Sequence, residues 1–292
     1  MPRTRRLSSA LPDLISVVVP TRDRPRSLDA CLAALDTQTA IERFEVVVVD
    51  DGSTAAEGVA EVVARHPRAR LLRVAQAGPA AARNAGARSS GGAVLCFTDD
   101  DCVPEPEWAE RLARAIDAGA DVVAGRTISS GGALADASEL IAWAPAAVQP
   151  FAPSNNLACR SSVFRMVAFD ESYPDAAAED RDWCARVAAA GHVLGIEPTA
   201  RLVHRQQLTL ARFMRRQLRY GRGAYRFRQG ARGQSPPPSF YLALLRRAFA
   251  HGVAVGVLVL LAQVVTAVGF ASAWGAGRRD ERRAPAEPLR PR

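Results

Sequence analysis

The sequence predicts an α/β fold: a doubly wound, mostly parallel sheet flanked by helices, followed by a C-terminal helical segment that associates with a membrane. Two observations predict the sheet. Short, β-branched apolar runs alternate with helical patterns through the first half of the chain, an order typical of βαβ units. The run at 15–19 is short and mostly β-branched, as expected of a parallel strand buried on both faces. A third observation predicts the C-terminal membrane segment: residues 253–273 contain no charge and would span about 31 Å as a helix.

The first half of the chain divides into regularly ordered elements. Strands are expected at 15–19, 44–49, 70–74, 93–98 and 122–125, and helices at 27–36, 56–65, 79–88 and 106–118. Pro20 ends the first strand, because proline donates no ladder hydrogen bond. Ser27 is expected to cap the first helix, and Pro79 suits the first turn of the third.

The second half is less regular. Residues 129–153 are rich in Gly, Ala and Pro and are expected to form a mobile loop over a site. A helix at 183–190 is predicted to end at Gly191. Residues 208–228 predict an amphipathic helix with apolar residues on one face and arginines on the others, which the prolines of 235–239 interrupt.

We therefore expect five segments: a flexible N-terminal tail (1–13), the α/β domain (14–206), a basic amphipathic helix (207–234), a transmembrane or interfacial helix (248–274) and a disordered tail (277–292). Arginines flank the apolar segment on both sides, so the positive-inside rule gives it no clear orientation. A helix that lies in the interface would remove this conflict. A buried C-terminal helix or a dimer contact is the alternative.

Basic residues are unevenly distributed. The 292 residues carry a formal net charge of +8 with no lysine, and residues 201–233 hold ten arginines without Asp or Glu. Such a block usually faces anionic lipid, phosphorylated substrate or nucleic acid. We expect anionic headgroups to face the arginine-rich helix. We expect no nucleic-acid partner, because that function gives no reason for the acidic clusters described below.

The cysteines and the N-terminal residues indicate a cytoplasmic location. Five cysteines are scattered along the chain without a Cys-x-x-Cys pair, which fits free thiols in a reducing compartment. The apolar run at 14–19 is too short for the core of a signal peptide. We therefore expect the α/β domain at the cytoplasmic face of the cell membrane.

Two acidic clusters follow predicted strands. Asp50 and Asp51 come after the second strand, and the triplet at 99–101 comes after the fourth. Ligands of open α/β sheets bind at the carboxyl ends of the strands. Three adjacent carboxylates repel one another unless a cation is near, and hard oxygen ligands suit Mg²⁺ or Mn²⁺. The alternative is that these acids only cap the helices that follow.

Five motifs in order now identify a resemblance. They read Ile-Ser-Val-Val-Val-Pro-Thr-Arg-Asp at 15–23, Val-Val-Val-Asp-Asp-Gly-Ser at 47–53, Gly-Pro-Ala-Ala-Ala-Arg-Asn-Ala-Gly at 78–86, the Asp triplet at 99–101, and Ala-Glu-Asp-Arg-Asp-Trp at 178–183. Together they resemble a family 2 glycosyltransferase of the GT-A fold over about residues 14–206. The resemblance implies an inverting transfer of sugar from a nucleotide-diphosphate sugar, commonly a UDP-sugar, to an acceptor hydroxyl.

The resemblance also implies roles for individual residues. The nucleotide-sugar ligands would be Pro20, Asp51, Arg83, Asp99 and Asp100. The ligands of a divalent cation, Mn²⁺ or Mg²⁺, would be Asp99, Asp101 and His204. Asp180 would be the general base with Glu179 beside it, and the acceptor side would include Asn155, Asn156 and Trp183. Two structural alternatives stay open: His204 as an ordinary structural histidine, and Asp180 as a carboxylate placed by the helix dipole.

Other functions fit the residues less well. A nucleotidyltransferase or a dehydrogenase would need a glycine-rich loop or a lysine after the first strand, where this chain has residues 20–23 instead. A non-catalytic or differently active nucleotide-binding, membrane-associated protein of the same fold remains the alternative. It predicts the loss of Asp101 or Asp180, and both are present. If the chain binds a membrane, we expect its acceptor to be a lipid-linked or cell-envelope glycan.

Overall fold

The computed structural model describes residues 14–39, 41–147, 151–173, 177–206, 208–229 and 236–283. The tail expected at 1–13 lies outside these ranges, as do residues 284–292 of the tail expected from 277. Residues 277–283 belong to the last helix.

Within the described residues, one eight-stranded mixed sheet runs in the order β3-β2-β1-β4-β7-β6-β8-β5. Its strands are β1 (Ile15–Thr21), β2 (Phe44–Asp51), β3 (Ala69–Val74), β4 (Val94–Thr98), β5 (Cys102–Pro104), β6 (Val122–Ser129), β7 (Asn156–Arg160) and β8 (Leu194–His204). The first four strands are parallel to one another, as their apolar runs predict. β7 is antiparallel to both of its neighbours, β4 and β6.

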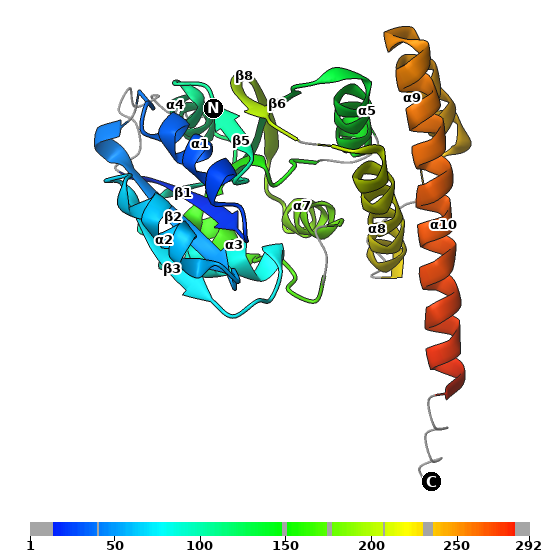
Figure 1. Ribbon diagram of the computed structural model, residues 1–292, viewed down its shortest axis with the longest axis horizontal. Coiled ribbons are helices and arrows are strands. Elements are labelled where there is room, and N and C mark those ends of the chain that lie inside the picture. The colour runs from blue at the N-terminus through cyan, green and yellow to red at the C-terminus, as the bar shows by residue number, and fades with distance from the viewer. Residues whose placement is uncertain are drawn as a thin grey trace, which may run out of the picture.

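Helices cover both faces of the sheet because β1 and β2 alternate their side chains between two apolar clusters (Figure 1). Val17 and Val19 pack with α1 (Pro25–Leu35), α2 (Ala56–Ala64) and α4 (Trp108–Asp117). Val18 packs with α3 (Pro79–Ser89), α6 (Ser161–Met166) and α7 (Glu179–Ala189). The predicted doubly wound α/β fold is confirmed. The predicted cap at Ser27 is wrong, because α1 begins two residues earlier at Pro25, a residue suited to a first turn.

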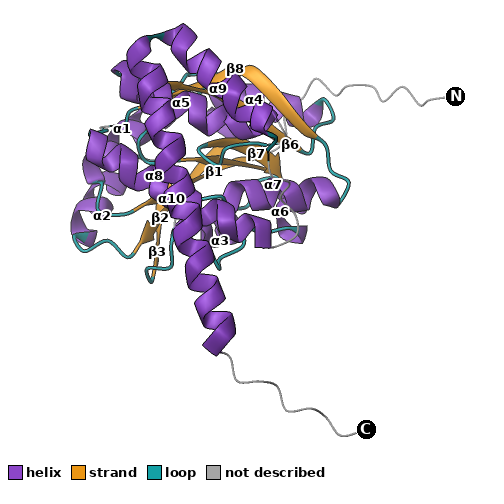
Figure 2. Cartoon of the chain, turned by 90° about the vertical axis from the view of Figure 1, so that its right-hand side faces the viewer, coloured by secondary structure: helices purple, strands orange, loops and turns teal. Residues whose placement is uncertain are grey.

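A third apolar cluster joins the helices that follow the sheet. It is formed by α5 (Gly132–Trp143), α8 (Leu210–Gln229), α9 (Pro238–His251) and α10 (Val253–Arg283). These helices form a layer to one side of the sheet, and α10 runs along its outer edge and extends beyond the α/β body (Figures 1 and 2). The loop expected at 129–153 contains helix α5, because its buried alanines and Leu140 pack against α8 and α10.

Two pairs of helices approach closely at glycines. A Cβ at Gly221 of α8 would lie 2.0 Å from the Thr266 carbonyl oxygen of α10, and one at Gly269 would lie 2.2 Å from the Leu218 carbonyl oxygen. A Cβ at Gly223 would lie 2.3 Å from the Ala177 carbonyl oxygen, just before α7. Glycine at these positions therefore lets α8 contact both the last helix and the start of α7.

Candidate active site

One large pocket lies between the carboxyl ends of the parallel strands and the C-terminal helices. Its volume is about 2150 Å³, about twice the upper end of the roughly 300–1,000 Å³ range of ordinary ligand pockets. Residues after β1, β2 and β4 line one side, and residues of α5, α8, α9 and α10 line the other. This space is large enough for two substrates side by side.

The end of β2 places one predicted ligand in the pocket. Asp51 accepts hydrogen bonds from the backbone N–H groups of Ala77 (2.8 Å) and Gly78 (3.0 Å), so the loop before α3 fixes its carboxylate. Pro20 lines the pocket beside it. Asp50 faces away from the pocket lining and accepts a hydrogen bond from the Ser53 N–H.

The three aspartates after β4 have different partners. Asp99 pairs with Arg83, with 2.7 Å between Oδ1 and Nη2. Asp100 is buried and accepts a hydrogen bond of 2.8 Å from the Thr21 hydroxyl, and burial raises its pKa to about 6. Asp101 pairs with His204, with 2.9 Å between Oδ1 and Nε2. Of the three aspartates, only Asp101 therefore contacts His204.

A divalent cation fits the chemistry of this pair. The ligand atoms of Asp101, Cys102 and His204 lie within 4.8 Å of one another. Cys102 is buried, and burial raises the pKa of its thiol well above the ordinary value, so it stays protonated and is a poor ligand. A carboxylate and an imidazole remain, which suits a Mn²⁺ or Mg²⁺ ion that takes its other ligands from water and phosphate oxygens. The pairing of Asp99 with Arg83 separates it from this group.

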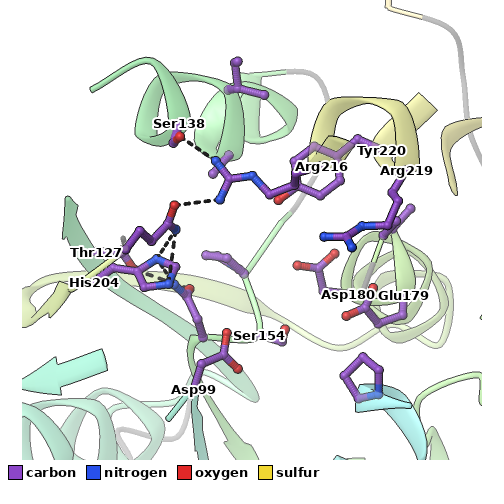
Figure 3. A pocket seen from close by; sticks show the side chains of 18 of the residues that line it. Asp99, Thr127, Ser138, Ser154, Glu179, Asp180, His204, Arg216, Arg219 and Tyr220 are labelled. Atoms are coloured by element: carbon purple, nitrogen blue, oxygen red, sulfur yellow. Dashed lines mark hydrogen bonds between the residues drawn. The ribbon is translucent and has the colours of Figure 1, made fainter. Parts of the chain in front are cut away.

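The first turn of α7 brings two more carboxylates to the pocket (Figure 3). Ala178 precedes them with φ of 74°, a conformation that costs a non-glycine residue energy and is often found at functional sites. Burial raises the pKa of Glu179 to about 7, and its carboxylate pairs with Arg83 at 3.2 Å. Burial also raises the pKa of Asp180, whose carboxylate accepts a hydrogen bond from the Ser154 backbone.

Arg83 thus joins the two halves of the site. Its guanidinium is buried and bridges Asp99 after β4 and Glu179 on α7. The family resemblance implies that this arginine contacts the nucleotide. In the structure its side chain holds the two acidic segments together. It lines the pocket, as does Asp99.

The predicted acceptor residues do not lie together. Asn155 lines the pocket, and its Nδ2 is 3.4 Å from His204 Nδ1. Asn156 is fully buried, and its Oδ1 accepts a hydrogen bond of 2.8 Å from Trp108 Nε1. Trp183 is fully buried against Phe164 and Phe169 and is absent from the described pocket lining. We therefore keep only Asn155 as a candidate acceptor residue.

Sequence reasoning missed two groups of arginines. Arg24 is 3.2 Å from both Asp100 and Asp101, and nothing in its local sequence marks it. The other group lies on α8, where Arg212, Arg215, Arg216, Arg219 and Arg228 line the pocket. These five arginines line the pocket, and the expectation that α8 turns its arginines to lipid headgroups stays a prediction. Their spacing puts residues 212, 215, 216 and 219 on one helix face, and that spacing could have indicated a shared ligand.

Comparison with known proteins agrees with this architecture. The glycosyl transferase family 2 model matches residues 16–170. Glycosyltransferase AglE of Haloferax volcanii is 36% identical over 140 residues, which cover 44% of this chain and 45% of that protein. A pre-mycofactocin glycosyltransferase of Mycobacterium tuberculosis is 30% identical over 230 residues, which cover 72% of this chain and 46% of the relative. The chain thus spans about half the length of these curated relatives.

A solved structure shares the fold over nearly the whole chain. It is a mannosyltransferase from Pyrobaculum calidifontis in complex with GDP-Man and Mn²⁺, with a TM-score of 0.59 and 20% sequence identity. The match covers 96% of this chain and 82% of the other. The match supports the GT-A fold that the motifs predict. Because the family model covers more than half of the residues, the chain belongs to glycosyl transferase family 2.

Proposed function

We propose that the protein transfers a sugar from a nucleoside-diphosphate sugar to an acceptor hydroxyl with inversion at the sugar carbon. One observation carries the proposal: a single pocket collects Asp51, the Asp101–His204 pair and Asp180 from four separate segments of the chain. These residues supply a base contact, a cation site and a proton acceptor, which a nucleotide-sugar transfer needs together. Membership of family 2 supports the reaction class.

The donor end of the pocket is the edge formed by β1, β2 and β4. Asp51 is held by two backbone N–H groups and is placed to accept hydrogen bonds from the nucleotide base. Asp101 and His204 would hold a divalent cation, which as a Lewis acid would neutralise charge on the leaving diphosphate. Arg24 lies beside the same carboxylates and lines the pocket, so it is placed to contact the diphosphate as well.

Asp180 is the proton acceptor in this proposal. The acceptor hydroxyl gives its proton to the Asp180 carboxylate as its oxygen bonds to the sugar carbon, and the bond from that carbon to the diphosphate breaks. Burial raises the pKa of Asp180, and a higher pKa makes a carboxylate a stronger base. With one such base and direct displacement, the configuration at the sugar carbon inverts.

The nucleotide is the first property to test. The motifs resemble enzymes that use UDP-sugars, whereas the related mannosyltransferase structure holds GDP-Man. A thermal-shift screen of nucleoside diphosphates, each with and without Mn²⁺, separates these choices. A Mn²⁺-dependent rise in Tm with one nucleotide supports the proposal through binding linkage. No rise with any nucleotide on folded protein supports a non-catalytic relative instead.

We further propose that the protein works at the cytoplasmic face of a membrane on a lipid-linked or cell-envelope acceptor. Residues 253–276 of α10 are long and apolar enough to cross a bilayer, and their most apolar 18-residue stretch has a mean hydropathy of 2.4. Only 28% of that 18-residue stretch is buried inside the protein, whereas the core helix of a soluble protein is mostly buried. Its outward apolar side chains form a stripe, Val253, Val257, Leu260, Leu261, Val264 and Val268, of a kind that marks an interaction surface.

Substitution of the proton acceptor tests the chemistry. We expect Asp180→Asn to retain nucleotide and Mn²⁺ binding and to lower the transfer rate by about 10²–10⁴-fold, the usual contribution of general base catalysis. Calorimetry measures binding, and a radiolabelled sugar assay measures transfer. Asp136→Asn on the exposed surface of α5 is the matched control. Near-normal turnover in Asp180→Asn would place the base elsewhere.

A further inference from the structure

The second half of the pocket has a composition of its own. Arginines of α8 line it next to α7, and apolar side chains of α9 and α10 line it beyond them, among them Phe240, Leu244 and Phe270. A donor at the strand ends, next to Asp51 and Asp101, leaves this half open, because the pocket holds about 2150 Å³. The second half therefore combines strong positive charge with apolar walls.

Three of the α8 arginines, Arg215, Arg216 and Arg219, form no ion pair with an acidic residue that the structure describes. No carboxylate lies within ion-pair distance of Arg215, Arg216 or Arg219 in the part of the chain that the structure describes. Arg216 instead donates hydrogen bonds to Gln206 Oε1 at 2.6 Å and to the Ser138 hydroxyl. Figure 3 shows the Arg219 guanidinium directed toward the carboxylate of Asp180. Three clustered cations that form no ion pair with the described residues favour an anionic ligand.

Gln217 is a second and independent sign of a ligand. Its side chain is 1% exposed and lines the pocket, and neither its amide oxygen nor its amide nitrogen has a hydrogen-bond partner among the described residues. Gln263 Nε2 on α10 is also buried without a partner and lines the same pocket. A buried polar group without a partner costs about 1–3 kcal/mol, so these amides indicate a polar ligand between α8 and α10.

We propose that this half of the pocket is an acceptor subsite for a phosphorylated amphiphile. Arg215, Arg216 and Arg219 would bind the phosphate, and Gln217 and Gln263 would bind its oxygens or an adjoining polar group. The apolar chain would lie along α9 and α10. The proposal rests on the proposed transferase function, since it assigns the acceptor of that reaction.

The apolar chain of the proposed ligand is inferred from α10, which lines the pocket and also reaches the exposed surface. Phe240 and Leu244 of α9 and Phe270 of α10 face the pocket, whereas Val257, Val264 and Val268 of α10 face outward. One helix therefore lines the subsite and also presents the exposed apolar stripe. An amphiphile whose chain lies in a membrane could reach the arginines along α10 without leaving apolar surroundings.

Guanidinium groups suit this head group. Arginine binds phosphate oxygens through paired, charge-assisted hydrogen bonds. Residues 215, 216 and 219 are one helical turn apart or less, so a single phosphate can be reached by more than one of them. A neutral glycan would gain little from this charge.

Calorimetry with three probes tests the subsite. The full-length chain, in a non-ionic detergent, is titrated with decyl phosphate, inorganic phosphate and decanol, each with the nucleoside diphosphate and Mn²⁺ already bound. We expect decyl phosphate to bind at least about tenfold more tightly than either fragment, because it alone supplies both chemistries. Inorganic phosphate that binds as tightly as decyl phosphate would overturn the amphiphile assignment.

Two variants locate the head group. Arg219→Ala and Arg215→Ala change exposed side chains, so the fold is expected to remain, and each should weaken decyl phosphate binding by about tenfold or more. Arg222→Ala removes the same charge from the same helix but outside the pocket lining. This control should change the affinity for decyl phosphate less than about twofold. Equal weakening by all three variants, or none, would overturn the subsite.

The same titration separates this inference from the proposed function. Nucleotide binding to the wild type is measured first, before any alkyl phosphate is added. If the nucleotide fails to bind, the transferase proposal fails whatever the amphiphile does. If the nucleotide binds and decyl phosphate does not, only the acceptor subsite is overturned.

Discussion

Asp101 and His204 come from the middle and the end of the α/β domain and meet in the structure. The aspartate follows β4 and the histidine ends β8, and antiparallel pairing of β5 with β8 sets Cys102 beside His204. Sequence motifs could predict both residues as candidates. They could not predict that Asp99 would be held by Arg83 instead, because that ion pair depends on the position of α3 over the sheet.

Loss of the Asp101 carboxylate tests the cation site at the residue scale. Outer-shell partners of metal sites are each worth about 10–100-fold in affinity, so removal of a ligand should cost at least about 100-fold. We expect Asp101→Asn to weaken Mn²⁺-dependent binding of the nucleoside diphosphate by that factor in calorimetry. Asp136→Asn serves again as the control, and unchanged binding in Asp101→Asn would remove this residue from the cation site.

Glu179 should make the stability of the protein depend on pH. Its pKa rises from 4.5 to about 7 on folding, so the folded protein keeps the proton to a higher pH than the unfolded chain. Its contribution to the free energy of unfolding is complete below about pH 4.5 and is lost as the pH rises through about 7. We expect urea denaturation between about pH 5 and 8 to show a smaller decline for Glu179→Gln than for the wild type.

The control for this prediction is Glu57→Gln, which changes an exposed glutamate on α2. Its pH dependence should follow that of the wild type. A decline in Glu179→Gln as steep as that of the wild type would show that other groups cause it.

At the scale of elements, the start of α7 is held from two sides. Arg83 of α3 binds Glu179 in its first turn, and Gly223 of α8 packs on Ala177 just before it. The sequence predicted α7 from residue 183, four residues after its observed start at Glu179. Residues 179–182 are all charged, so local hydrophobic pattern gave no sign of a helix, and long-range contacts decide the boundary.

The contact between α8 and α10 gives a prediction about stability. A Cβ at Gly221 would meet backbone atoms of α10, with the Thr266 oxygen at 2.0 Å, so the two helices would have to separate. We expect Gly221→Ala to lower the free energy of unfolding by about 1–3 kcal/mol, the usual cost of overpacking. Denaturant titration in a non-ionic detergent measures it.

Gly58 in α2 is the matched control for Gly221. A Cβ there would lie 3.8 Å from Pro25 Cγ, an ordinary contact. Alanine is favoured over glycine within a helix by about 1 kcal/mol, so Gly58→Ala should be neutral or stabilising. Equal effects of the two substitutions on the free energy of unfolding would show that the close approach of α8 and α10 does not determine the cost of Gly221→Ala.

At the scale of the whole molecule, the α/β half was predictable and the helical layer only partly so. Strands such as 15–19 and 44–49 can bury their apolar side chains only between two layers of helices, so the local pattern predicts the sheet. Both α8 and the apolar part of α10 were expected as helices, but α5 was expected as a loop. The arginines of α8 follow no local rule, because whether they face lipid or a pocket depends on how α5, α9 and α10 pack around them.

The proposed membrane attachment concerns the whole molecule and can be tested without disturbing its packing. Leu261 and Val264 lie on the outward face of α10. A charged residue near the centre of a membrane helix costs about 2.5–3.5 kcal/mol, so Leu261→Glu/Val264→Glu should shift the protein from liposomes to the soluble fraction in flotation. Val193→Glu/Ile196→Glu, which alters two exposed apolar residues of the α/β domain, should leave flotation unchanged.

The glycine contact that locks α8 against α10 has a consequence for kinetics. With the exposed apolar stripe of α10 in the membrane interface, the arginine face of α8 is kept at a constant distance from the membrane, and the search for an acceptor is reduced from three dimensions to two. Turnover would then follow the mole fraction of acceptor in the lipid, and dilution of the membrane with inert lipid would slow the reaction even at constant total acceptor.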